Sequence, residues 1–456
     1  MPLLTHLTDV LWNPWLLGLF LLTGLYCSVR TGFFQLFGLK TWLRATVGSV
    51  LRPAVGSPGR GISQAQALCT ALASTIGTGS IAGVATAIWF GGPGAVFWMW
   101  VSAILGMMTS FVEKTLAVKF RCKGPDGTWM GGPMHYLQNG VGSRFLAVWF
   151  AFACLCATLT GGNLVQSSSI AASLNAAFGW DKLAVGVILT LLTGLVMAGG
   201  LGRIAGVSTL MVPVMALLYL GGGVLVLIAR GEEVPAMLEN IVTCAFAPQA
   251  ALGGCAGYTV DQAMRFGVAR GVFTNEAGLG TSAMAHAAAD VDHPARQGMW
   301  GILEVGVSTL MVCTVTALVI LVSGVYDPGL GAAGVPPSCG LGAPMTAAAF
   351  SAVLGSAGST VVAVSLLLFA FSSILGWSYY GQQCLSYLTG GSAGAKLYRG
   401  VFLGVVLLGS ICDSTGVWVL VDFCNALMAV PNLIALLMLS GCACQELRRW
   451  RAKREK

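Results

Sequence analysis

The chain has 456 residues, of which 56% are hydrophobic and only 9% are charged, and its mean hydropathy is +0.81. A composition this apolar excludes a soluble protein and indicates an integral membrane protein. The net charge of +7 does not indicate a nucleic-acid-binding surface, because Lys and Arg gather in alternate loops and in the C-terminal tail.

Apolar runs, compared with the ~20 residues that cross a hydrocarbon core, predict an all-α polytopic protein with about eleven crossings. The predicted spans are 11–30, 63–90, 95–119, 145–176, 182–199, 205–229, 254–289, 298–323, 353–388, 397–412 and 415–443. After the first span, an odd number of crossings in each half inverts the second half relative to the first, as in the inverted repeats of transporters. The predicted units are 1–62 (an extra span with a connecting segment), 63–230 (a first repeat), 231–253 (an outer loop), 254–443 (a second repeat) and 444–456 (a basic tail).

The loops that follow the first and third spans are basic, whereas the stretch 324–344 contains no Lys or Arg. The basic residues of those two loops are Arg30, Lys40, Arg44, Arg52, Arg60, Lys119, Arg121, Lys123 and Arg144. Because basic loops stay on the cytoplasmic side, we predict a cell-membrane protein with its N-terminus outside and its tail in the cytoplasm. The stretch 40–60 is either an amphipathic segment on the cytoplasmic surface or a plain loop.

The second predicted span is interrupted at 73–83 by glycines and hydroxyl groups. At the centre of this first break are Gly77, Thr78, Gly79 and Ser80. A half-helix that begins after the break would aim free N–H groups at a carboxylate. One that ends before it would aim carbonyls from around Ala73 and Ile76 at a small cation. The alternative is that the glycines only let helices pack closely.

A second break at 273–280 interrupts the seventh predicted span. It begins with Phe273, Thr274, Asn275 and Glu276. Paired breaks in corresponding halves of a polytopic chain indicate a transporter binding site. A carboxylate at membrane depth is a functional candidate, able to bind an amino group, a cation or a proton. The alternative is structural: Glu276 caps a half-helix or pairs with Arg265 or Arg270.

Two more spans carry polar clusters. The cluster in the fourth span is Asn163, Gln166, Ser167, Ser168 and Ser169. Asn163 and Gln166 share a helix face, so the cluster fits either an amide that reaches a substrate or hydrogen bonds between helices. In the ninth span Ser373 and Trp377, with Ser372 beside them, look the same way: a hydroxyl suits sodium and an indole suits the wall of a small pocket. The alternative for Trp377 is an anchor at the membrane interface.

The remaining chemistry-bearing residues predict neither an enzyme nor a cofactor. The pairs Cys154/Cys156 and Cys442/Cys444 have no histidine at ligand distance. No H-E-x-x-H motif is present, and we expect His286 to pack or to form a hydrogen bond. A disulfide among Cys244, Cys255 and Cys339 is left open.

Several motifs together resemble the alanine or glycine:cation symporter family over nearly the whole chain. They are TIGTGSIAGVATAI at 75–88, GGPG at 91–94, GGP at 131–133, GNLVQ at 162–166, RGVFTNEAGLG at 270–280 and SILGWSYYG at 373–381. The resemblance implies a leucine-transporter-like fold of five plus five spans with one extra. It implies import of alanine or glycine with sodium, and substrate contacts at the first break, Gln166, the stretch 273–276 and Trp377.

By analogy with that fold, a sodium site would use carbonyls near Ala73, Ile76 and Phe369 with the hydroxyls of Ser372 and Ser373. The chain departs from the family pattern at two positions, where Ser80 and Ser168 stand in place of the usual asparagine. Each departure replaces a longer amide with a hydroxyl, which puts the size of the preferred substrate, or a second ion, in question.

We therefore hypothesise a secondary symporter that couples a small neutral amino acid to sodium. Proton coupling through Glu276 is the nearer rival. An amino-acid-gated channel or sensor on the same fold is the more distant rival.

Overall fold

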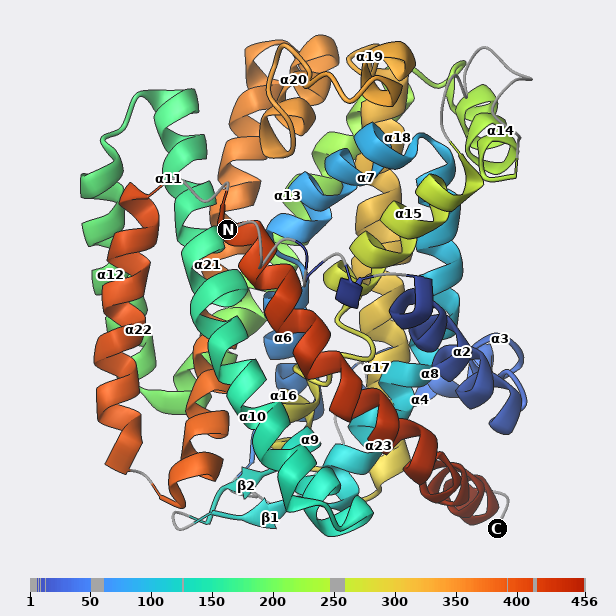
Figure 1. Cartoon of the computed structure of the whole chain (residues 1–456), viewed down its shortest axis with the longest axis vertical. Helices are drawn as coiled ribbons and strands as arrows, with labels where there is room; N and C mark the ends of the chain where they lie inside the picture. Colours follow the sequence, from blue (N-terminus) through green and yellow to red (C-terminus); the bar gives the residue numbers. More distant parts are fainter. Residues whose placement is uncertain are drawn as a thin grey trace.

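The computed structural model describes residues 6, 8, 10–12, 14–50, 61–124, 127–246, 259–391, 393–412 and 416–454. The predictions at Arg52, Arg60 and Cys255 lie outside these residues. Within them, the chain is helical apart from one hairpin of the strands β1 (Cys122–Lys123) and β2 (Trp129–Met130) (Figure 1). Cys244 is in a disulfide, whereas Cys339 is a free thiol.

The predicted spans coincide with helices. Those of the first half are α2 (Pro14–Arg30), α6 (Gln64–Thr75) with η1 (Gly79–Gly83) and α7 (Val84–Gly91), α8 (Gly94–Lys119), α10 (Arg144–Leu159) with η3 (Thr160–Leu164) and α11 (Val165–Phe178), α12 (Lys182–Ala198) and α13 (Gly200–Ala229). Those of the second half are α15 (Val260–Asn275) with α16 (Ala283–Ala287), α17 (Pro294–Val305) with η4 (Gly306–Cys313) and α18 (Thr314–Val322), α21 (Ser356–Thr389), α22 (Ala393–Ile411) and α23 (Val417–Arg454). The segments labelled η are π-helical turns.

Shorter elements connect these helices. They are α3 (Phe34–Phe37), α4 (Leu39–Ala45), α5 (Val47–Val50), α9 (Pro133–Tyr136), η2 (Leu137–Val141), α14 (Val234–Cys244), α19 (Pro328–Ala332) and α20 (Ala343–Leu354). The short helices α3, α4 and α5 occupy the described part of the stretch that we predicted as an amphipathic segment or a loop.

Length and hydropathy allow seven helices of the described residues to cross a membrane, and the bent pair of α6 with η1 and α7 makes an eighth. The apolar helices α2 and α12 have 17 residues each. An all-helical protein with many apolar helices is therefore confirmed, and the number of crossings stays a prediction. Strand β1 and the end of α23, which carry basic residues, lie at the same end of the bundle (Figure 1).

Both broken helices begin with the same local signal. In α6 the hydroxyl of Ser63 accepts from the N–H of Gln66 at 3.1 Å, and the amide of Gln66 accepts from the N–H of Ser63 at 2.9 Å. Thr259 and Gln262 repeat this reciprocal capping box at the start of α15. A capping box satisfies the free N–H groups of a helix start. The two halves of the chain thus open in the same way.

The breaks themselves differ in shape. Helix α6 ends at Thr75, and the chain bends by 53° before it continues through η1 into α7. Helix α15 runs on through Asn275, so the second break begins at Glu276 rather than at Phe273. Glu276 adopts a left-handed conformation with φ of 54° and ends the helix.

Helix α8 is central to the packing of the second half, because it lies against both α15 and α17. Close approach requires small residues. A Cβ atom added at Gly301 would lie 2.7 Å from the hydroxyl oxygen of Ser110, so a larger residue would push α17 away from α8.

A short parallel bridge joins the chain before α6 to the chain after α16. The N–H of Ile62 donates to the carbonyl of Ala288 at 3.2 Å, and the N–H of Asp290 donates to the carbonyl of Ile62 at 2.8 Å. The guanidinium of Arg121 also donates to the carbonyls of Ala287 and Ala289, at 3.1 and 2.6 Å. The end of the second break is thereby tied to the beginning of the first broken helix.

Candidate functional site

A cavity lies between the two breaks. It is lined by Ser74, Thr75, Gly77, Gly79, Gly161, Gln166, Phe273, Glu276, Leu279, Trp377, Val421 and Asn425. Its empty space is about 380 Å³, including the part open to solvent. Both breaks, the π-helical turn η3 and the helices α11, α15, α21 and α23 all contribute to its wall.

A cluster of uncharged oxygen atoms lies beside the first break. The hydroxyl of Ser373 donates to the carbonyls of Ala73 and Ser74 at 3.0 and 3.2 Å. The hydroxyl of Ser372 is 3.2 Å from the carbonyl oxygen of Ala73 and 2.9 Å from that of Phe369. All four side chains of Ser372, Ser373, Ser74 and Phe369 are buried. Carbonyl and hydroxyl oxygens are ligands for hard cations, so this cluster can hold a small cation.

Ile76, the other residue expected at this site, is the C-cap residue of α6, with φ of −84° and ψ of 78°. It therefore stands where the chain leaves helical geometry. The break brings Ala73 next to Phe369, Ser372 and Ser373, although Ala73 and Ser373 are 300 positions apart in the sequence.

Gln166 spans the distance from α11 to the first break. Its amide oxygen accepts from the N–H of Thr78 at 3.3 Å, and its amide nitrogen donates to the carbonyl of Gly161 at 3.0 Å. A Cβ at Gly77 would lie 2.6 Å from the hydroxyl oxygen of Ser373 and 3.3 Å from the amide oxygen of Gln166. Gly77 is thus the point where the amide and the oxygen cluster meet.

Aromatic side chains narrow the cavity. Trp377 lies directly against Gly162, where an added Cβ would overlap the indole. A Cβ at Gly79 would lie 2.9 Å from the ring of Phe273. Trp377 is 7% exposed and its ring centroid is 5.8 Å from that of Tyr380, so it forms part of the interior rather than an interfacial anchor.

Glu276 lines the cavity and is buried. Its carboxylate accepts a short hydrogen bond from the hydroxyl of Thr281 in the same break. Glu276 is the C-cap residue of α15 and does not cap a helix start. Arg270, one of its expected ion-pair partners, pairs with Asp422 at 3.7 Å.

Five other predicted contact residues are not among the described residues that line this cavity: Thr78, Ser80, Asn163, Thr274 and Asn275. The amide of Asn163, which lies in the π-helical turn η3, donates to the carbonyl of Phe402 on α22 at 2.8 Å. The carbonyl of Ser80 accepts from Thr316 at 3.0 Å. The hydroxyl of Thr274 donates to the nearby main-chain carbonyl of Arg270, and the amide oxygen of Asn275 accepts from the N–H of Ala277.

Several lining residues were not predicted from the sequence. They are Ser74, Thr75, Gly161, Leu279, Val421 and Asn425. Ser74 and Thr75 lie within the predicted break 73–83, and its glycines were a sufficient signal for them. Val421 and Asn425 come from α23, where Asn425 is a polar residue within an apolar helix and could have been found on that ground.

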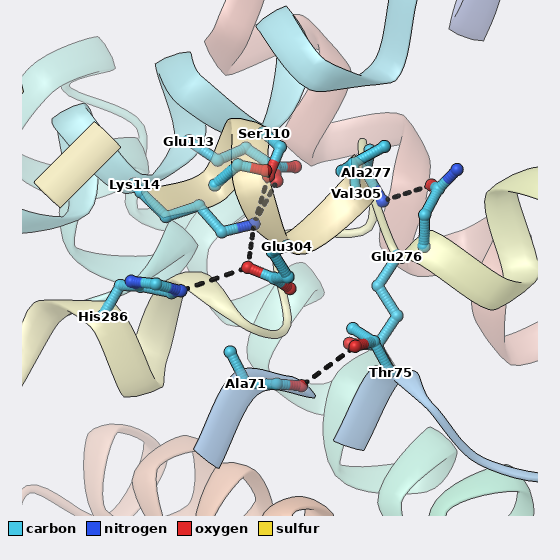
Figure 2. Close-up of polar contacts among 12 residues, drawn as sticks. Ala71, Thr75, Ser110, Glu113, Lys114, Glu276, Ala277, His286, Glu304 and Val305 are labelled. Atoms are coloured by element: carbon cyan, nitrogen blue, oxygen red, sulfur yellow. Dashed lines mark hydrogen bonds and ion pairs between the residues drawn. The ribbon is translucent and has the colours of Figure 1, made fainter. Parts of the chain in front are cut away.

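A buried charged network beside the second break was also not predicted (Figure 2). Lys114 of α8 lies between Glu113 and Glu304, and His286 contacts Glu304 on its other side. The signal was present in the sequence, since Glu113, Lys114 and Glu304 are charged residues within apolar spans, which are rare and functional by default.

A helical membrane bundle with two broken helices around a small buried cavity defines a membrane transporter. The chain belongs to the sodium:alanine symporter family, whose profile matches residues 2–456. It is 40% identical to the sodium/alanine symporter AgcS of Methanococcus maripaludis, over 97% of this chain and 96% of that protein. It is 42% identical to an uncharacterized transporter of Haemophilus influenzae, over 97% and 94% of the two chains.

Solved structures agree on the fold. The crystal structure of MhsT in complex with L-phenylalanine matches with a TM-score of 0.58, at 12% identity, over 84% of this chain and 90% of that chain. The chain therefore has the leucine-transporter-like fold. At this level of identity the likeness concerns the fold alone.

Proposed function

We propose that this chain imports a small neutral amino acid, alanine or glycine, together with sodium, by alternating access. The observation that carries the proposal is the cluster of oxygen atoms of Ala73, Phe369, Ser372 and Ser373, which adjoins the cavity at Gly77. A cation at this cluster would join α21 to the end of α6, and so would fix the first break from outside the cavity.

The amino acid would then bind at the first break. Backbone N–H groups near a helix start attract a carboxylate, and Gln166 already holds the N–H of Thr78 at the edge of the cavity. The close contacts of Trp377 with Gly162 and of Phe273 with Gly79 favour a small side chain. The lining of the cavity supports six of the predicted residues as the proposed substrate contacts: Gly77, Gly79, Gln166, Phe273, Glu276 and Trp377.

The proposed architecture is five plus five spans in inverted repeats, 63–230 and 254–443, with one extra span before them. The repeated capping boxes at Ser63 and Thr259 support equivalent openings of the two halves. We propose that the end with β1 and the tail faces the cytoplasm, because basic loops stay on that side.

Uptake by purified protein in proteoliposomes tests this function. We expect an inward sodium gradient to drive saturable accumulation of alanine or glycine above its outside concentration. Flux that is unaffected by inward and outward sodium gradients would refute coupling to sodium. Saturable flux without uphill accumulation under any gradient would favour a channel instead.

Proton coupling through Glu276 is the second candidate, since this carboxylate lines the cavity. Uptake in sodium-free medium that is driven by a pH gradient, and that is lost in Glu276→Gln, would favour it. Uptake that needs sodium at every pH would exclude it.

A further inference from the structure

The charged network of Glu113, Lys114 and Glu304 is fully buried, with 0% exposure of each side chain. The ammonium of Lys114 is 3.5 Å from a carboxylate oxygen of Glu113 and 3.4 Å from one of Glu304. It also donates to the hydroxyl of Ser110 at 2.7 Å, and that hydroxyl donates to the carbonyl of Gly301 at 3.0 Å. One cation thus holds two carboxylates from two helices, α8 and α17.

Glu113 reaches the beginning of the second break. Its other carboxylate oxygen accepts from the N–H of Gly278 at 2.9 Å and from the amide of Asn432 on α23 at 2.7 Å. The same amide donates to the carbonyl of Gly278 at 2.8 Å, and Tyr136 donates to Asn432. Gly278 has φ of 97°, so its peptide groups lie outside any helix and need partners of this kind.

Glu304 reaches the end of the same break. Its carboxylate oxygen that faces Lys114 is also 3.1 Å from the ring nitrogen Nε2 of His286, in α16. The other ring nitrogen of His286 is 2.6 Å from the amide nitrogen of Gln297 on α17 (Figure 2 shows the His286 and Glu304 contact). The two carboxylates that share Lys114 therefore hold the segment 276–287 at both ends, Glu113 at its non-helical part and Glu304 at helix α16.

Stability alone does not account for this arrangement. A buried ion pair costs so much desolvation that apolar side chains of similar volume are often as stable or more stable. Apolar side chains cannot accept a hydrogen bond from the N–H of Gly278, whereas the carboxylate of Glu113 does. Lys114 supplies the positive charge that keeps two such acceptors in place.

We infer that Lys114 is a positioning residue which acts as a resident cation for the second break. The segment 276–287 is held through Glu113 and Glu304 by the ammonium of Lys114, which is part of α8. The first break is held by neutral oxygens, which can bind an exchangeable cation. The wall formed by Glu276 and Leu279 is thereby preformed without sodium. This inference rests on the proposed function only for the identity of the exchangeable cation.

Hydrogen exchange of the full-length protein in detergent, with NaCl or with choline chloride, tests the inference. In the wild type, we expect sodium to slow exchange in 73–83 and to leave 276–287 unchanged. In Lys114→Met we expect exchange in 276–287 to be about 100-fold faster, because two buried carboxylates lose their shared partner. Sodium should still slow exchange in 73–83 of that variant.

Three further variants separate positioning from general destabilisation. Lys114→Arg keeps the charge, so it should restore slow exchange in 276–287 and much of the alanine uptake. The double variant Lys114→Met with Glu304→Gln removes one excess negative charge, so it should recover part of the protection from exchange near His286. It can be measured even if Lys114→Met alone fails to fold. Lys119→Met, on the same helix but in a partly exposed pair with Glu446, should leave the segment unchanged.

Uptake kinetics distinguish a role in positioning the cavity wall from a general effect on stability. Lys114→Met with Glu304→Gln should raise the KM for alanine, and Lys114→Arg should keep it near the wild-type value. In both variants the sodium concentration for half-maximal thermal stabilisation should stay at the wild-type value. Sodium-dependent exchange in 276–287 of the wild type, or unchanged exchange there in Lys114→Met, would overturn the inference. A wild type in which 73–83 ignores sodium would instead overturn the proposed function and leave the role of Lys114 standing.

Discussion

The two breaks in the helices stabilise non-helical backbone by different chemical means. At the first break the partners are uncharged: the hydroxyls of Ser372 and Ser373, backbone carbonyls and the amide of Gln166. At the second break they are charged, since Glu113 and Glu304 hold the segment and share Lys114. Neutral oxygens can bind a cation reversibly, whereas the carboxylates at the second break already share the ammonium of Lys114. Under the proposed function, the first break would respond to sodium and the second would form a fixed wall.

Replacement of Glu113 should have the largest effect. Glu113→Ala removes the acceptor of Gly278 and leaves Lys114 with one carboxylate, so we expect a loss of about 3–5 kcal/mol in stability. The measurement is the apparent melting temperature in detergent. Glu233→Ala is the control, because its pair with Arg230 is exposed on both sides and such pairs contribute about 0–1 kcal/mol. Equal melting temperatures of the two variants would remove the contrast between the breaks.

Replacement of Ser373 should have the next largest effect, and it should act on sodium. Ser373→Ala removes one ligand oxygen, so we expect the sodium concentration for half-maximal uptake to rise about tenfold, in line with ~1.4 kcal/mol for one lost polar contact. Ser378→Ala is the control on the same helix, because among the described residues its hydroxyl bonds only to the carbonyl of Leu375, at 2.7 Å. A wild-type sodium requirement in Ser373→Ala would remove this residue from the site.

Replacement of Gln166 should act on the amino acid more than on sodium. Gln166→Ala frees the N–H of Thr78 and removes the amide from the cavity wall. We expect the KM for alanine to rise about five- to tenfold, as for one hydrogen bond of ~1 kcal/mol. Sodium-induced thermal stabilisation, measured without amino acid, should change less. If the sodium response falls and the KM is unaltered, Gln166 supports the break and does not contact the substrate.

Replacement of Asn163 should have the smallest effect on transport. Its amide bonds to the carbonyl of Phe402 and not to either break. We expect Asn163→Ala to cost about 1 kcal/mol of stability and to leave the KM for alanine at the wild-type value. A large rise in KM would show that the cavity extends to Asn163 during transport.

The sequence predicted the helices and both breaks because their signals are local. Apolar runs locate the helices, and glycines with hydroxyl groups locate the first break. The resemblance to a known family indicated the oxygen cluster of Ser373 and Ala73, which the structure brings within hydrogen-bond distance.

Other features depend on contacts that no local pattern contains. Lys114 and Glu304 are distant in the sequence, and only the packing of α8 against α17 brings them together. Asn163 and Gln166, which we predicted to share a helix face, bond to different partners, Phe402 on α22 and Thr78 in the first break. A π-helical turn, η3, lies between 160 and 164. A regular period of 3.6 residues does not apply across such a turn.

The bridge between Ile62 and the chain around Ala289 has a mechanical consequence. Any motion that swings the start of α6 away from the bundle must first break hydrogen bonds made only by main-chain atoms. The side chains of Ile62 and Ala289 are themselves buried beside Ala67 and Ala205, so release of this end would also expose a small apolar cluster to solvent. A larger residue at Gly61 would disrupt this bridge, since an added Cβ would lie 2.8 Å from the carbonyl oxygen of Ala288.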